Sequence, residues 1–132
     1  MAAALSNYMG NLILKALLNG TNLTAPTTVY MGLATGSVSI SELSGGSYGR
    51  QAVTFASLGS GLTSSNTSDA TFINLPTASI AYIQLWDAPT SGHFLFAATI
   101  DVSGTPTPTS VTAGDSVTFA AGRLTIVFTG LA

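Results

Sequence analysis

The hydrophobic pattern changes once along the chain, close to residue 20. In residues 5–17 apolar side chains recur at helical spacing, with asparagines and one lysine on the opposite side. Gly20 follows this segment and suits the left-handed conformation that ends many helices. The sequence therefore predicts one amphipathic helix over residues 1–20, with Tyr8 and Leu12 on its apolar face.

Beyond residue 20 the period shortens to two. Short runs rich in Val, Ile, Thr, Phe and Tyr are separated by Gly, Pro, Ser and Asn, which is typical of antiparallel strands joined by turns. The runs that predict strands are TTVYMGLA, RQAVTFA, ASIAYIQLWD, HFLFAATID, DSVTFAAG and RLTIVFTG. We expect a mainly β protein: an antiparallel β-sandwich or jelly-roll-like domain over residues 21–132 with one N-terminal α-helix, forming a single domain overall.

Two connections and two strands add detail to this prediction. DAPTSG, between Trp86 and His93, predicts a hairpin turn, whereas VSGTPTPTS, residues 102–110, is predicted to be a loop because its prolines lack the ladder donor. The runs ASIAYIQLWD and HFLFAATID are apolar on both faces. Such strands are either the centre of two packed sheets or carry a face that another subunit covers.

The composition is unusual in its lack of charge. Charged residues make up 6% of the 132 residues, and the formal net charge is −2 with three basic side chains, whereas about 25% charged residues is usual. So few cations cannot neutralise a phosphate backbone, which excludes a nucleic-acid partner. Near-zero charge favours association, so the outer faces are either covered by neighbours or hydrated by hydroxyls and amides in a monomer.

Membrane and thiol chemistry are also disfavoured. The apolar stretch LILKALL is short and is interrupted by Lys15, so it cannot supply the about 20 residues that a spanning helix needs. The N-terminus lacks the basic region of a secretory signal, so we expect the chain to stay in the cell that makes it. The absence of cysteine excludes disulfides, thiolate nucleophiles and cysteine metal sites.

The sequence shows no complete set of catalytic residues. His93 is the single histidine, and nothing marks one serine as its nucleophile, so we interpret it as a turn or surface residue. The carboxylates are Glu42, Asp69, Asp87, Asp101 and Asp115. Asp87, Asp101 and Asp115 stand at strand ends or turns, where aspartate accepts backbone hydrogen bonds. We expect no enzymatic activity, no cofactor and no metal site.

The segment SGGSYGRQAVTF, residues 44–55, places Arg50 behind three glycines at the start of a strand. It has no following Lys-Ser/Thr and no helix, so it does not predict a phosphate loop. Gly45 and Gly46 instead permit a turn or bulge. Arg50 either pairs with a carboxylate of its own subunit or reaches across an interface, because its planar guanidinium suits a bidentate acidic partner.

These segments together resemble a family of small virion proteins of tailed bacteriophages, often labelled tail fibre proteins and similar to head decoration (cement) proteins. The resemblance extends along nearly the whole chain. The segments that carry it are LSNYMGNLILKALLNGTNLTAPTTVYMGLATG, SGGSYGRQAVTF, AYIQLWDAPTSGHFLFAATI and VTAGDSVTFAAGRLTIVF. The sequence departs from the family pattern where an acid-rich stretch usually follows the first strand, since GSVSISEL retains Glu42 alone.

The resemblance implies a non-enzymatic structural protein that is made in the host cytoplasm and becomes part of the virion. The leading expectation is a decoration protein on the outer capsid surface, a homo-oligomer (trimer) that binds and stabilises the lattice of major capsid protein. The alternative is a tail or tail-fibre component that contacts the host surface. No nucleic acid and no membrane are expected as partners. The residues expected at interfaces are Arg50, Tyr48, Gly45, Gly46, Tyr8 and Leu12.

Overall fold

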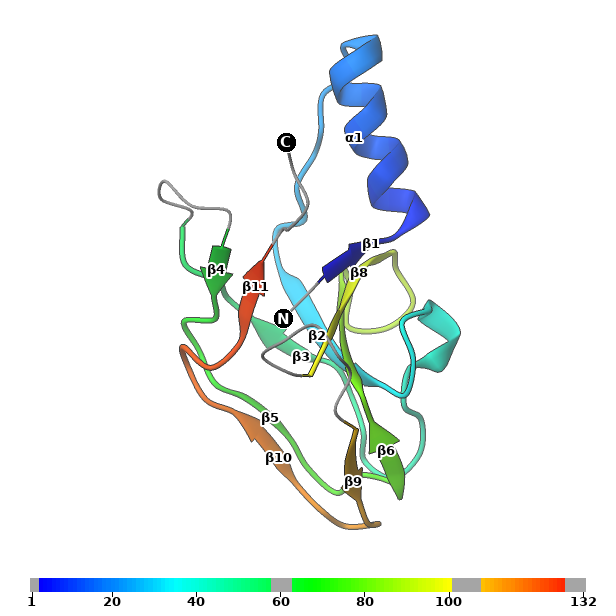
Figure 1. Cartoon of the computed structure of the whole chain (residues 1–132), viewed down its shortest axis with the longest axis vertical. Coiled ribbons are helices and arrows are strands. Elements are labelled where there is room, and N and C mark those ends of the chain that lie inside the picture. The colour runs from blue at the N-terminus through cyan, green and yellow to red at the C-terminus, as the bar shows by residue number, and fades with distance from the viewer. Residues whose placement is uncertain (1–2, 58–62, 101–107, 128–132) are drawn as a thin grey trace.

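A computed structural model describes residues 3–57, 63–100 and 108–127, and it is mainly β with one N-terminal α-helix in that part of the chain (Figure 1). The helix α1 (Asn7–Asn19) stands at one end of the molecule, and the strands form the body below it. A single turn of 3₁₀-helix, Ser39–Ser41, interrupts the strands. The predicted fold class is confirmed.

The larger layer is an antiparallel sheet of five strands in the order β1-β8-β7-β2-β3. The strands are β1 (Ala3–Leu5), β2 (Val29–Ala34), β3 (Gln51–Val53), β7 (Tyr82–Trp86) and β8 (Phe94–Thr99). The β7–β8 hairpin encloses the DAPTSG turn predicted from the sequence. Strands β2, β7 and β8 lie inside the sheet, and residues on both faces of β7 and β8 are buried, in keeping with their apolar sequences.

The second layer consists of three antiparallel two-stranded ribbons rather than one continuous sheet. They pair β5 (Ala70–Phe72) with β10 (Val117–Phe119), β4 (Thr63–Ser65) with β11 (Thr125–Val127), and β6 (Ala78–Ile80) with β9 (Thr109–Val111). These strands are three residues long, too short to show a reliable period of two. Strands β4, β5 and β9 were therefore missed in the sequence, as was β1.

Two details of the strand predictions are corrected by the structure. The run ASIAYIQLWD is two strands, β6 and β7, which separate at Ala81, where the chain passes from the ribbons to the large sheet; the N–H of Ala81 donates to Ala34. The predicted loop of residues 102–110 is wrong at its end, because Thr109 and Ser110 belong to β9. Pro108 directly precedes that strand, while residues 102–107 lie outside the described part of the chain.

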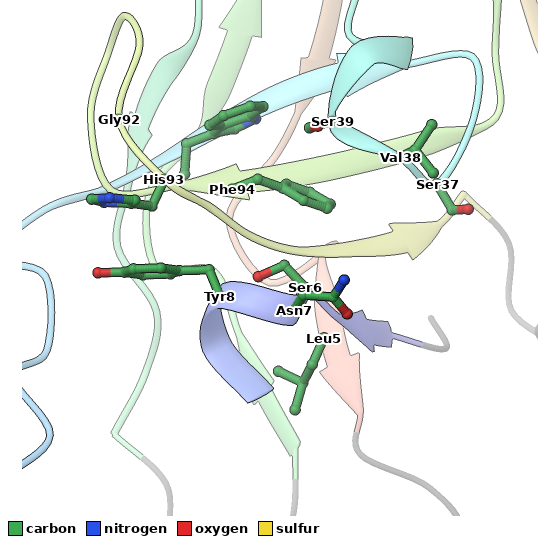
Figure 2. A pocket seen from close by; sticks show the side chains of 11 residues that line it. Leu5, Ser6, Asn7, Tyr8, Ser37, Val38, Ser39, Gly92, His93 and Phe94 are labelled. Carbon is green, nitrogen blue, oxygen red and sulfur yellow. The ribbon is translucent and has the colours of Figure 1, made fainter. Parts of the chain in front are cut away.

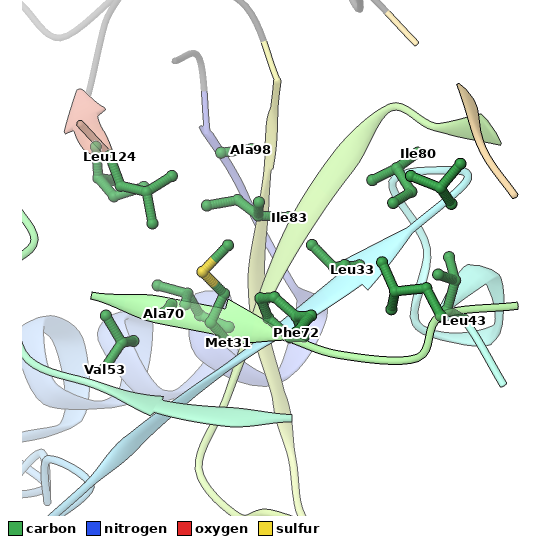
Figure 3. Close-up of a cluster of buried hydrophobic side chains, with 14 residues drawn as sticks. Met31, Leu33, Leu43, Val53, Ala70, Phe72, Ile80, Ile83, Ala98 and Leu124 are labelled. Carbon is green, nitrogen blue, oxygen red and sulfur yellow. The ribbon is translucent and has the colours of Figure 1, made fainter. Parts of the chain in front are cut away.

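The hydrophobic core lies between the two layers (Figure 3). Met31, Leu33 and Ile83 project from the large sheet and are fully buried, and Leu124 meets them from the segment before β11. Phe72 is 1% exposed; its ring lies 6.0 Å from that of Tyr48 and 6.3 Å, edge-on, from that of Phe119. The core thus joins the ribbons to the sheet.

The helix α1 is defined by local capping more than by burial. The Ser6 hydroxyl accepts a hydrogen bond from the N–H of Met9 at 3.1 Å, and Gly20 ends the helix at φ 67°. None of its residues is buried, although the N–H of Ser6 donates to the carbonyl of Leu95 and ties the first turn to β8. The helix itself is confirmed, but the predicted start at residue 1 is wrong, because Ala3–Leu5 form β1 and the Ser6 cap begins the helix at Asn7. Leu14, Leu17 and Leu18 are exposed.

Candidate functional site

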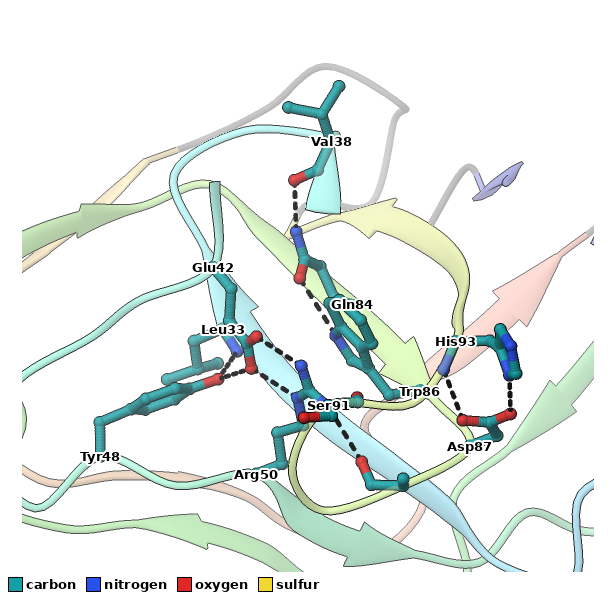
Figure 4. Close-up of polar contacts among 11 residues, drawn as sticks. Leu33, Val38, Glu42, Tyr48, Arg50, Gln84, Trp86, Asp87, Ser91 and His93 are labelled. Atoms are coloured by element: carbon teal, nitrogen blue, oxygen red, sulfur yellow. Dashed lines mark hydrogen bonds and ion pairs between the residues drawn. The ribbon is translucent and has the colours of Figure 1, made fainter. Parts of the chain in front are cut away.

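Arg50 is the centre of a polar cluster at the sheet edge (Figure 4). Its Nε and Nη2 donate to the two carboxylate oxygens of Glu42, each at 2.7 Å, which is the bidentate geometry that guanidinium favours. Nη1 donates to the carbonyl oxygens of Ala88 and Ser91, at 3.0 and 2.8 Å. The sequence left two alternatives for Arg50, an ion pair with a carboxylate of its own subunit or a contact across an interface. The structure shows the ion pair with Glu42 of the same chain.

The same guanidinium lies flat against Trp86, with its central carbon 3.6 Å from the ring centroid. The indole N–H of Trp86 donates to Gln84, and the amide of Gln84 donates to the carbonyl of Val38. The Arg50 side chain is 8% exposed and that of Glu42 17%. Arg50 therefore joins β3, the segment before it and the β7–β8 turn, and it presents little surface to a neighbour.

Tyr48 anchors the turn that leads to Arg50. Its hydroxyl donates to Glu42 at 2.9 Å and accepts from the N–H of Leu33 at 3.0 Å. A Cβ at Gly32 would lie 2.8 Å from the Tyr48 hydroxyl and 2.9 Å from a Glu42 carboxylate oxygen, so this approach requires glycine. No feature of the sequence pointed to Gly32, whereas Glu42 stood out as the one acid in an almost uncharged segment.

Gly45 and Gly46 shape the turn, with φ angles of 105° and 59°. A Cβ at Gly46 would also overlap the carbonyl oxygen of Asn74. We predict that Gly46→Ala lowers the free energy of unfolding by about 1–2 kcal/mol through left-handed strain. Urea denaturation measures this effect. Gly49→Ala is the control, since no atom lies within 4 Å of its Cβ position, and equal losses for both variants would contradict the role given to Gly46.

The Tyr48 hydroxyl also makes stability depend on alkaline pH. Burial, with the nearby Glu42 carboxylate, raises the pKa of Tyr48 above its ordinary value, although the Leu33 N–H opposes the shift. Because the folded pKa is raised, this contribution is complete below about pH 10 and is lost as the pH rises toward the folded pKa. We predict that the unfolding free energy of Tyr48→Phe falls less steeply above pH 10 than that of the unmodified chain. Parallel slopes would contradict this prediction.

His93 lies on the surface at the base of α1, as expected for a turn residue. Its backbone N–H donates to one carboxylate oxygen of Asp87 at 2.6 Å, and its Nδ1 lies 2.8 Å from the other. The hydrogen bond from the His93 backbone is the largest cause that lowers the pKa of Asp87. Tyr8 stacks on the imidazole with ring centroids 4.0 Å apart and planes 3° from parallel (Figure 2).

Two hollows meet at this stacked pair. One, of about 610 Å³, lies between the start of α1, the β7–β8 turn and the segment before the 3₁₀ turn, with Trp86 and Phe94 in its wall (Figure 2). The other, of about 320 Å³, lies between α1 and the segment 23–26. Of the expected interface residues, Tyr8 lines both hollows and Leu12 lines the second. Arg50 and Tyr48 line neither and instead belong to the polar cluster.

A family model described as "Podophage GP4 fiber I protein gp80" matches residues 4–127. The chain belongs to this gp80 family. No curated protein matches the chain. Membership of the gp80 family makes the chain a structural protein of a phage virion, in agreement with the coarser part of the resemblance. The agreement concerns membership of the virion and not the position of the protein on the capsid or the tail.

The chemistry of the described residues accords with a structural protein of the gp80 family. Asp115 and Asp87 accept the backbone N–H groups of Thr112 and His93, as predicted for turn aspartates, and Asp101 lies outside the described residues. Asp69, for which no such role was predicted, accepts the N–H of Ala121. Across the described ranges no hydrogen bond joins a hydroxyl group to the His93 ring. Those ranges hold no cluster of three metal-ligating side chains.

No helix in the described ranges is long and apolar enough to cross a membrane. The residues expected at interfaces come together in two places, the polar cluster and the base of α1. Their contacts with another chain stay a prediction.

Proposed function

We propose that this chain is a non-enzymatic structural subunit of a podophage virion fibre. The observation that carries the proposal is the gp80 family match over residues 4–127, since that family is described as a fibre protein. A rigid body with exposed apolar attachment surface suits a subunit that holds its place among other virion proteins. The ion pair between Arg50 and Glu42 supports this interpretation, because the two charges neutralise each other inside the fold.

The β7–β8 turn is the part of this body best suited to contact the host surface. Its residues 89–93 are exposed, and Arg50 and Asp87 hold both ends of the turn by hydrogen bonds. A turn that is fixed before binding loses little conformational entropy on contact. A glycan array of host polysaccharides tests this part of the proposal, and an absence of binding would oppose it.

Capsid decoration is the second candidate function. The charge-poor composition favours it, because a subunit repeated on a lattice of major capsid protein needs many modest symmetric contacts rather than a few charged ones. In this form the protein lies on the outer capsid surface. The two candidates differ most clearly in the number of copies that a virion carries.

Quantitative mass spectrometry of purified virions, with the major capsid protein as reference, tests the two functions. We expect on the order of tens of copies for a fibre subunit and on the order of hundreds, in simple ratio to the capsid subunits, for decoration. Immunogold electron microscopy then locates the copies on the tail or the head. Absence from the virion would overturn both proposals.

A further inference from the structure

The helix α1 carries apolar side chains on two opposite faces. With about 100° of rotation per residue, Leu14, Leu17 and Leu18 lie on one face, and Tyr8 and Leu12 lie on the other. Only the second face turns toward the body of the chain, where it lines the hollow against the segment 23–26. A helix that carries apolar side chains on two faces is normally covered by neighbours on both.

The outer face, which we name the leucine face, is open along its length. Leu14, Leu17 and Leu18 are 55%, 75% and 76% exposed, at the i, i+3, i+4 spacing by which one helix packs on another. Lys15 is the single charge on α1, and it borders Leu18 on the helix surface. It forms no ion pair within the described ranges.

The hollow on the inner side, which we name the groove, is complementary to the leucine face. Its walls are mainly apolar and include Leu12 of α1 and Leu23, which is 46% exposed. One wall carries Asp87, the acidic residue among the groove residues, whose carboxylate also accepts the backbone N–H of His93 and lies 2.8 Å from the Nδ1 of its ring. The groove thus offers apolar surface with one negative charge, whereas the leucine face offers apolar surface with one positive charge.

We propose that a second copy of this chain occupies the groove, with its leucine face packed against Leu12 and Leu23 and its Lys15 near Asp87. The chain itself supplies both halves of this contact, and their charges are opposite. The inference goes beyond the proposed function, because it concerns contacts between copies and not the place of the protein in the virion.

The contact is head-to-tail, because the two matching surfaces lie on opposite sides of one helix. Such a contact leaves a free leucine face and a free groove at its ends, so further copies add until the rotation closes a ring. A closed ring hides every exposed leucine of α1. The expected trimer is one closed form of this arrangement.

Cysteine cross-linking tests the contact directly, because the natural chain contains no cysteine. Two full-length variants, Leu18→Cys and Leu23→Cys, are oxidised separately and as a mixture, and the products are separated by non-reducing electrophoresis. Disulfide-linked pairs that join one variant to the other, and form mainly in the mixture, support the head-to-tail contact. Linked pairs that form equally well from Leu18→Cys alone would overturn it, because they place two leucine faces against each other.

Light scattering of the unmodified chain over a range of concentrations gives a second, independent result. We expect an oligomer, and a rise of about tenfold or more in the dissociation constant for Leu17→Ser. Ile40→Ser is the matched control, because Ile40 is 93% exposed on the 3₁₀ turn and lies outside the groove. A monomer at all concentrations, or equal weakening by both variants, would overturn the proposal. The number of copies in the virion stays a separate result.

Discussion

Arg50→Met lowers the free energy of unfolding by about 3–5 kcal/mol. The substitution keeps an unbranched apolar stem against Trp86 but leaves the Glu42 carboxylate, 17% exposed, without its bidentate partner. It also removes the donor that holds the carbonyl groups of Ala88 and Ser91. Urea denaturation measures the change, and the slope of the unfolding free energy against urea should stay constant.

Two further variants separate the ion pair from general effects of losing a cation. Lys15→Met removes an exposed charge from α1 and should change the unfolding free energy by no more than about 0.5 kcal/mol. The double variant Glu42→Gln, Arg50→Met should be less destabilised than the sum of its single changes, because no buried charge is left alone. A loss for Arg50→Met as small as that for Lys15→Met would show that the cluster does not hold the fold together.

Phe72→Ala lowers the free energy of unfolding by a similar amount, about 3–5 kcal/mol. Phe72 is 1% exposed and packs between Tyr48 and Phe119, so its removal leaves a cavity where the β5–β10 ribbon meets the large sheet. The neighbouring Ile73 points outward and is 58% exposed. Ile73→Ala is therefore the matched control and should have little effect, and equal losses from the two positions would contradict this account of the core.

The helix and the three inner strands of the large sheet were predictable because their signals are local. Gly20 marked the end of α1 in the sequence, whereas the Ser6 cap that begins the helix at Asn7 was not identified and the start was predicted too early. Strands β2, β7 and β8 are five or six residues long and strongly apolar, which is enough to identify a strand. Of the ribbon strands, β6, β10 and β11 were predicted as parts of longer apolar runs, whereas β4, β5 and β9 were missed because three residues alone cannot show a period.

The partners of Arg50 could not be predicted from the sequence. Glu42 is eight residues away and Ala88 is 38, and these segments meet only because β7 pairs with β2 and β2 with β3. The sequence shows that a carboxylate accepting two hydrogen bonds would suit the guanidinium of Arg50, but it does not show which carboxylate lies beside it. The same holds for Tyr8 and His93, which stack across 85 residues because β8 returns beneath α1.

The sequence by itself determined the class of the protein: a charge-poor, cysteine-free, mainly β chain with one capped amphipathic helix, resembling phage virion proteins. These properties follow from composition and from interactions between near neighbours. Only the tertiary structure decided that Arg50 is paired inside its own subunit and that Leu14, Leu17 and Leu18 of α1 are exposed while Leu12 faces the body. Both depend on long-range strand pairing, because pairing brings distant side chains together and determines which apolar faces the chain can cover.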